Sequence, residues 1–171
     1  PWFKCRARDM FISLPGLTLA IDEKAKYEEM MTTASKAIRN FINDEPDDLK
    51  VYEMEHPDVL LWAVWCIQQY AKMVSKEECI EKYGALLAEI MEYLCNENHP
   101  NLFLHGNGLL YTNGHDRAVT WMNSTANGRP VIPRTGYVVE INALWYNALC
   151  FVADLLGKEE YKELAEKTGV S

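Results

Sequence analysis

The segment from Val119 to Leu149 carries the residues whose types and spacing could do chemistry. A loop rich in Asn, Gly, Pro and Arg follows Trp121, and an apolar helix is predicted after it, interrupted by Glu140, Asn142 and Asn147. Buried amides and carboxylates cost free energy unless they find partners, so ordinary cores avoid this mixture. A sugar-binding pocket needs it, because aromatic faces cover the ring while fixed polar groups bind the hydroxyls. The three polar residues could instead cap neighbouring loops, and composition alone leaves both interpretations open.

A family resemblance rests on three segments of the chain, RDMFISLPGLTL, HPDVLLWAVWCIQQYAK and TWMNSTANGRPVIPRTGYVVEINALWYNAL. In order and approximate spacing they are similar to the amylo-α-1,6-glucosidase module of glycogen debranching enzymes. That family folds as an (α/α)6 toroid of paired helices and hydrolyses α-1,6-glucosidic branch points with inversion. The resemblance therefore implies an all-α fold, a glycogen-like α-glucan as partner, and glycoside hydrolase activity.

The resemblance also implies roles for particular residues. Glucoamylase-like enzymes use a comparable Arg-Asp pair to hold the terminal glucose, and Arg8-Asp9 stands at the corresponding place. An exposed ion pair beside a helix N-terminus is the alternative for these two residues. The other residues implied to bind substrate are Trp121, Arg134, Glu140 and Trp145.

The general acid is the residue at which this chain departs from the family. Inverting glycosidases need two carboxyl groups, one as general acid and one as general base. The family acid is the Asp of TWMD, where this chain has Asn123, and the base comes from a later helix that we expect beyond Ser171. An amide donates hydrogen bonds but has no usable acidity. Glu140 is the candidate substitute acid, although the family keeps a Glu here beside its Asp, which favours a ligand to sugar hydroxyls or to Arg134.

Three functions follow from these patterns. The first is part of a debranching α-1,6-glucosidase, with the 171-residue chain inactive on its own. The second is a non-catalytic carbohydrate-binding relative that has lost the general acid. The third, and the weakest, is a helical interaction module without a sugar site.

Length, charge and cysteine content limit the remaining possibilities. We expect residues 1–171 to form a single helical domain, a fragment of a larger glycoside hydrolase domain, because the chain opens without Met directly into a family motif. A formal net charge of −8 argues against nucleic acid or an anionic membrane as partner. Five scattered cysteines form no metal-binding spacing and indicate a reducing, cytoplasmic compartment. We expect neither a metal nor a cofactor.

The periodicity of apolar residues predicts six helices, at residues 8–20, 22–42, 57–73, from 75 to about 94, 138–156 and 158–167. The first, third and fifth are apolar nearly all round, and the others have one polar face, which predicts inner and outer layers. We expect a kink or break at Pro15-Gly16, helix caps at Asp22, Ser75 and Gly157, and a short strand at residues 109–111. The six helices would make half of a toroid, although a straight α-solenoid shows the same alternation.

Overall fold

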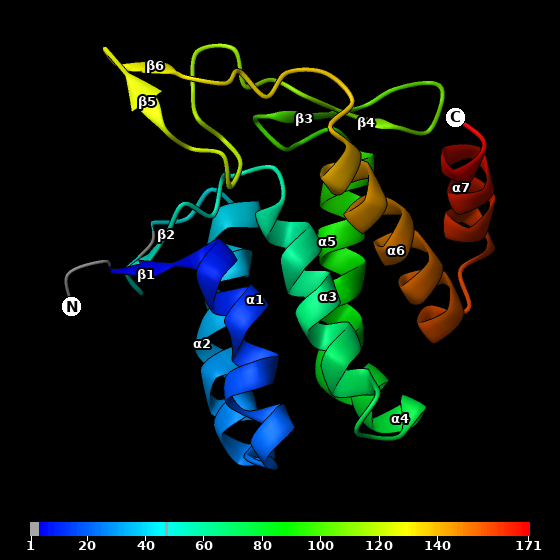
Figure 1. Cartoon of the computed structure of the whole chain (residues 1–171). Helices are drawn as coiled ribbons and strands as arrows, with labels where there is room; N and C mark the ends of the chain where they lie inside the picture. Colours follow the sequence, from blue (N-terminus) through cyan, green and yellow to red (C-terminus); the bar gives the residue numbers. More distant parts are fainter. Residues whose placement is uncertain (1–3, 47) are drawn as a thin grey trace.

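The computed structural model describes residues 4–46 and 48–171, and these form a mostly helical protein (Figure 1). The all-α prediction is confirmed. The α-helices are α1 (Ala7–Leu17), α2 (Lys24–Ile42), α3 (Val59–Ala71), α4 (Lys76–Cys79), α5 (Ala85–Cys95), α6 (Val139–Leu156) and α7 (Glu159–Gly169). A 3-10 turn (Leu19–Ile21) follows α1, and a π-helical turn (Ile80–Gly84) joins α4 to α5.

The strands are short and form three separate pairs. β1 (Cys5–Arg6) pairs in parallel with β2 (Val51–Tyr52). β3 (Leu102–Leu104) pairs antiparallel with β4 (Leu110–Thr112), and β5 (Thr125–Ala126) pairs antiparallel with β6 (Arg129–Pro130). The strand expected at residues 109–111 therefore exists as β4, one residue later in the chain.

The helices lie in two rows (Figure 1). α1 packs against α3 and α3 against α6, so that these three form one row, while α2 and α5 lie behind it and α7 packs against α6. α1, α3 and α6 all begin at the same end of the molecule, beside the β3–β4 and β5–β6 hairpins (Figure 1). This arrangement matches the predicted inner and outer layers. The closure of such rows into a ring stays a prediction.

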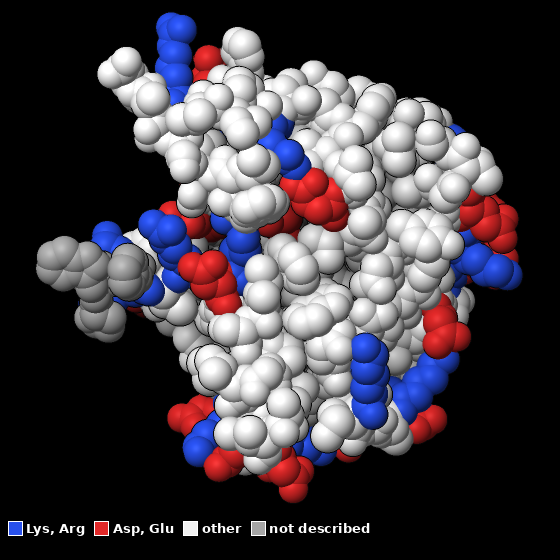
Figure 2. Space-filling view, viewed as in Figure 1, with Lys and Arg blue, Asp and Glu red and all other residues white. Residues whose placement is uncertain are grey.

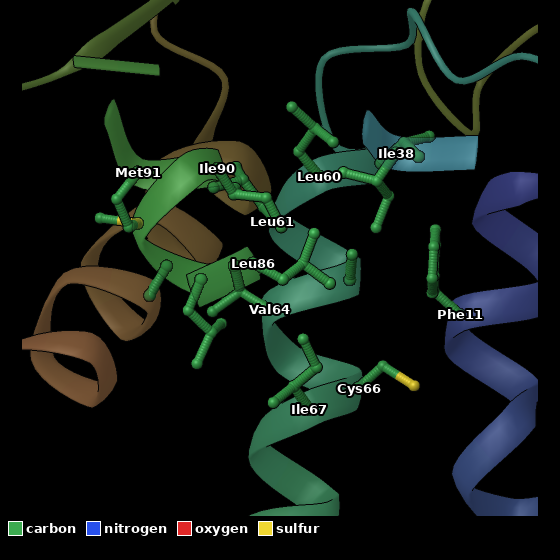
Figure 3. Close-up of a cluster of buried hydrophobic side chains, with 14 of the residues drawn as sticks. Phe11, Ile38, Leu60, Leu61, Val64, Cys66, Ile67, Leu86, Ile90 and Met91 are labelled. Atoms are coloured by element: carbon green, nitrogen blue, oxygen red, sulfur yellow. The ribbon is translucent and has the colours of Figure 1, made fainter. Parts of the chain in front are cut away.

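The hydrophobic core is centred on α3. Eight of its 13 residues are buried, as its all-round apolarity predicts. Side chains from α1, α2 and α5 meet it, and Figure 3 shows Phe11, Ile38 and Ile90 approaching from these three helices. The hydroxyl of Tyr27 on α2 donates to the carbonyl of Cys66 at 3.0 Å, which joins the two rows through a buried hydrogen bond.

The other predicted inner helix, α6, is less buried than expected. Only six of its 18 residues are buried, against six of 11 in α5, so this predicted inner helix is less buried than a predicted outer one. Four exposed residues, each about one helical turn from the next, form a stripe along α6: Val139, Ala143, Tyr146 and Cys150. The reason is that α3 and α7 cover only part of its circumference. By length and composition alone α6 could also cross a bilayer, with a mean hydropathy of 1.3.

Two of the three expected helix caps are confirmed. Ser75 Oγ accepts a hydrogen bond from the Glu78 amide at 3.1 Å, and Gly157 ends α6 in the left-handed conformation with φ of 66°. The prediction for Asp22 is wrong. Asp22 is itself left-handed, with φ of 64°, and its amide closes the 3-10 turn by donating to the Leu19 carbonyl. α2 therefore begins only at Lys24.

Pro15 lies inside α1 and does not break it. The helix continues through Pro15 to Leu17 and ends only there. A proline near the end of a short helix removes one backbone donor but few later hydrogen bonds depend on it. The helix was expected to kink or break at Pro15-Gly16, and instead it ends at Leu17, two residues after the proline.

Candidate functional site

Trp121, Arg134 and Glu140 form one hydrogen-bonded cluster in front of α6. The indole Nε1 of Trp121 donates to Glu140 Oε1 at 3.2 Å, and Arg134 Nη2 donates to the same oxygen. Trp121 is 62% exposed, so most of its indole surface faces solvent while its N–H is fixed. The three residues come from the loop before β5, the segment after β6 and the first turn of α6, and the family resemblance implied that each of them binds substrate.

Arg134 also contacts Met122 and Gly114. Arg134 Nη1 lies 3.4 Å from the sulfur of Met122, and a Cβ on Gly114 would lie 2.5 Å from the carbonyl oxygen of Arg134. Gly114 is therefore required for the close approach of two backbone segments. Its amide also donates to Thr135 Oγ1 at 3.1 Å, which ties the loop after β4 to the segment that carries Arg134.

Asn142 and Asn147 have structural partners on neighbouring elements. The Asn142 amide accepts from the Leu110 amide at 2.8 Å and donates to the Leu110 carbonyl at 3.0 Å, so it pairs with β4 as another strand would. Asn147 exchanges two hydrogen bonds with Gln68 on α3, at 3.0 and 3.1 Å. Both residues therefore have structural partners inside the fold, but neither caps a loop, because Asn142 binds strand β4 and Asn147 binds helix α3.

Trp145 lies in the core and is not brought to the cluster. Its ring is fully buried, and its Nε1 donates to the Gly108 carbonyl at 3.1 Å. Thr168 on α7 donates to the same carbonyl at 2.8 Å. In this structure Trp145 anchors the β3–β4 hairpin to α6 and α7 and offers no face to a ligand.

Arg8 is a buried cation whose partner is not its sequence neighbour. Its Nε and Nη2 donate to the two carboxylate oxygens of Asp58 at 2.7 and 2.9 Å, and the side chains of Arg8 and Asp58 are 7% and 4% exposed. Nη2 also lies 3.0 Å from His56 Nδ1 and 3.3 Å from the Val119 carbonyl. The exposed Arg8-Asp9 ion pair that sequence offered as an alternative is therefore wrong.

His56 completes the contacts of Arg8. Since a guanidinium only donates, His56 Nδ1 is the acceptor of this hydrogen bond. Burial and the adjacent Arg8 cation lower the pKa of His56, while Glu53, Glu55 and Asp58 act in the opposite direction.

Asp9 lies apart from the Trp121 cluster. It is exposed in the first turn of α1 and borders a groove of about 700 Å³ between α1 and α2. Its carboxylate makes no hydrogen bond to the described residues, and its backbone carbonyl accepts from Ser13 Oγ at 2.6 Å. Arg8 and Asp9 thus face different surroundings although they are adjacent in sequence.

Asn123 lines a separate polar cavity of about 500 Å³ between the β5–β6 hairpin and residues 53–56, which follow β2. The walls include the carboxyl groups of Glu53, Glu55 and Asp116 and the ring of His56. Figure 2 shows the surface notched between the β5–β6 hairpin and the β1–β2 pair, with charges of both signs along the notch. Asn123 is exposed and has no hydrogen-bond partner in the described part of the chain.

Comparison with known protein families matches residues 1–170 to amylo-alpha-1,6-glucosidase. The chain belongs to this family. No curated protein and no solved structure matches it. The resemblance carried by the three sequence segments is thereby confirmed over nearly the whole chain.

Two features of the site were not predicted from the sequence, namely the Arg8–Asp58 ion pair and the β5–β6 hairpin. Asp58 holds Arg8 and makes no side-chain cap of α3. Arg8 and Asp58 are 50 residues apart, so no local pattern reveals the pair. A signal for the hairpin that follows Asn123 was present, because Asn127-Gly128 is the preferred turn dipeptide and both residues have positive φ.

The chain thus combines a hydrogen-bonded Trp-Arg-Glu cluster with the exposed amide side chain of Asn123. The cluster and the Asn123 cavity are connected by the backbone of residues 121–123. No group of His, Cys, Asp and Glu side chains in residues 4–46 and 48–171 is arranged to hold a metal ion.

Proposed function

We propose that this chain is part of a debranching α-1,6-glucosidase and binds an α-glucan at the Trp121–Arg134–Glu140 cluster. The observation that carries the proposal is the exposed indole of Trp121, fixed through its N–H by Glu140. A glucose ring has apolar faces and a rim of hydroxyl groups, so a fixed aromatic surface beside a carboxylate and a guanidinium suits it. Family membership supports the choice of an α-glucan.

Each residue of the proposed site has a separate task. The Trp121 indole covers one face of a glucose ring, and Glu140 Oε2, which has no partner among the described residues, accepts a hydrogen bond from a hydroxyl. Arg134 orients Glu140 and neutralises its charge, since it donates to the other oxygen. Because Trp121 and Arg134 hold Glu140 before the sugar arrives, little side-chain entropy is lost on binding.

The proposed chemistry stops at binding in the 171-residue chain. Inverting hydrolysis needs a proton for the leaving oxygen and a second carboxylate to activate water, roughly 6.5 to 9.5 Å away. Asn123 cannot supply that proton, and the carboxyl groups of the Asn123 cavity have no assigned role in the reaction. We therefore propose that this chain holds glucan without hydrolysing it.

The binding proposal is tested by titrating a branched α-glucan oligosaccharide into the chain and following the indole N–H resonance of Trp121. We expect this resonance to shift, and we expect Trp121→Ala and Glu140→Gln to weaken binding roughly tenfold or more. Tyr146→Ala is the matched control, because Tyr146 is also an exposed aromatic but lies on the α6 stripe. An unshifted Trp121 resonance, or an equal loss with Tyr146→Ala, contradicts the proposal.

A non-catalytic carbohydrate-binding relative is the second candidate, and Asn123 is the observation that favours it. Asn123→Asp separates the two in a polypeptide that also supplies the family's base. For a debranching enzyme lacking only its acid, the substitution raises release of glucose from a branched limit dextrin by about 100- to 10,000-fold. For a binding protein, turnover stays at background while glucan affinity is unchanged.

The ring closure implied by the resemblance belongs to the same proposal. We propose that α1, α3 and α6 are inner helices and α2, α5 and α7 are outer helices of an (α/α)6 toroid. The exposed apolar stripe of α6 supports this, because an inner helix of a closed ring has a neighbour on each flank.

A further inference from the structure

Arg8 is a charged residue that the fold has almost completely removed from water. It is 5% exposed, and its carboxylate partner, Asp58, is 3% exposed. Burying two ions is costly, and the attraction between them offsets this cost only with good geometry and further hydrogen bonds. Both conditions hold here, because the pair is bidentate and Arg8 reaches two more acceptors.

One of these acceptors lies far along the chain. The Val119 carbonyl is 111 residues from Arg8, and its residue belongs to the loop that leads from β4 to β5. Val119 and Thr120 are buried, and the next residue is the exposed Trp121. The Arg8 contact therefore fixes the backbone immediately before the indole.

We propose that Arg8 is a positioning residue that anchors the loop of residues 113–124 to the start of α3 and thereby sets the place of Trp121. Asp58 holds the guanidinium in the orientation from which Nη2 reaches Val119. The anchoring of the loop is independent of the proposed function, whereas its consequence for glucan affinity rests on it. In this assignment Arg8 supports the site from behind and does not contact the sugar.

The decisive variant removes the ion pair without leaving a buried charge. Arg8→Met combined with Asp58→Leu replaces both ions by apolar side chains, a change that buried pairs often tolerate. The matched control is Arg39→Met with Glu89→Leu, because Arg39 and Glu89 form another two-bond pair, at 2.8 and 3.3 Å, between α2 and α5. Among the described residues neither Arg39 nor Glu89 makes a hydrogen bond or ion pair with the loop of residues 113–124.

Two measurements on the unliganded 171-residue chain report the loop directly. We expect amide hydrogen exchange at residues 119–122 to become on the order of tenfold faster in the Arg8/Asp58 variant, while exchange in α3 and α6 stays slow. The indole N–H resonance of Trp121, assigned by its loss in Trp121→Phe, is expected to move toward the position of a solvent-exposed indole. The Arg39/Glu89 control changes neither. Unchanged loop exchange and an unchanged Trp121 resonance overturn the proposal.

Arg8→Lys gives a second route if the double variant does not fold. Lysine keeps the charge beside Asp58 but lacks the planar fork that reaches two carboxylate oxygens and a carbonyl together. We expect faster exchange at residues 119–122 in this variant too, with the remainder of the fold intact. Exchange at the wild-type rate overturns the proposal.

The glucan titration keeps the two proposals separate. If the loop loosens in the variants but wild-type chain binds no glucan, the proposed function fails and the anchoring role of Arg8 stands. If wild type binds glucan and the loop does not loosen, the anchoring role fails alone. If both stand, we expect the Arg8/Asp58 variant to bind glucan more weakly than the Arg39/Glu89 control.

Discussion

Polar side chains packed into this chain differ in where their hydrogen bonds go, and that difference separates structural residues from candidate functional ones. Asn142 and Asn147 use both ends of their amides on neighbouring elements. Glu140 receives two donors at a single oxygen beside an exposed indole. A residue whose hydrogen-bonding capacity is spent inside the fold stabilises it, whereas one with an unused acceptor at the surface is placed to bind a ligand.

His99 is the buried residue whose titration should control acid stability. It is 2% exposed, its Nδ1 accepts from the Asn101 amide at 3.1 Å, and its ring lies edge-on to Phe41 and Tyr93. Burial, with a smaller effect of nearby His56, lowers the pKa of His99 to about 4. Protonation of Nδ1 would also break its hydrogen bond with Asn101.

The free energy of unfolding should therefore fall as the pH decreases from 6.5 toward about 4, because the unfolded chain takes up a proton there and the folded chain does not. The gap corresponds to about 3 kcal/mol, at about 1.4 kcal/mol per pH unit. The stabilisation is complete above pH 6.5. Urea unfolding across this range measures it, and His99→Asn, which keeps an acceptor for Asn101, should show a shallower dependence. Identical slopes for the two proteins would contradict the assignment.

At the scale of elements, the site depends on backbone segments that approach closely in front of α6. Thr112 in β4 exchanges two hydrogen bonds with Gly136, each of 2.9 Å, and Gly114 packs on the Arg134 carbonyl. These contacts fix the direction in which the chain enters α6, and with it the positions of Arg134 and Glu140. The β3–β4 hairpin and the residue after it thus help to position the cluster, although none of the three cluster residues lies in a strand.

Gly114→Ala should disturb the close contact between the loop after β4 and the segment that carries Arg134. The added Cβ would lie 2.5 Å from the Arg134 oxygen and 3.0 Å from Val119 Cγ2, so the two segments must separate. We expect a loss of about 1 to 3 kcal/mol in the free energy of unfolding, the usual cost of overpacking, and a shifted Trp121 resonance. Chemical denaturation and the indole resonance measure the two effects. Gly106→Ala is the control, since its Cβ meets nothing within 4 Å, and an equal loss there would refute the explanation.

The elements themselves were largely predictable, whereas their contacts were not. Apolar periodicity and the caps at Ser75 and Gly157 located the helices, because these signals act over a few residues. Asp22 was misassigned because capping and left-handed turns favour the same short polar residues. The Arg8–Asp58 pair and the burial of Trp145 depend on tertiary packing, and a sequence without an alignment contains no local signal for either.

At the scale of the whole molecule, two rows of helices leave edges that other helices would cover in a closed ring. One edge is the α6 stripe beside a groove of about 500 Å³ that includes Tyr146 and Thr168. The other is the groove of about 700 Å³ between α1 and α2, with Leu17 exposed beside it. Exposed apolar residues at both edges of the two rows are expected if further helices pack there. The family resemblance favours a toroid as the form that such rows would make.

Cys150 is a natural reporter of the α6 edge, because it lies on the exposed stripe of that helix. In the 171-residue chain with Cys5→Ser, which removes the other exposed thiol, a thiol reagent should modify Cys150 rapidly. Burial raises the pKa of Cys66 to about 12 and that of Cys79 and Cys95 to about 11, so these thiols are both less accessible and less ionised. They should react slowly until the chain is unfolded.

In a polypeptide that supplies the remaining helices of the proposed ring, the α6 stripe is covered and Cys150 should react far more slowly, roughly tenfold or more. Mass spectrometry of the labelled peptides measures the rate at each cysteine separately. The chain without those helices is the control, and the buried Cys66 shows whether both proteins are equally folded. A Cys150 that reacts at the same rate in both proteins would mean that no helix packs on this edge, and the row would then end at α6 without closing into a toroid.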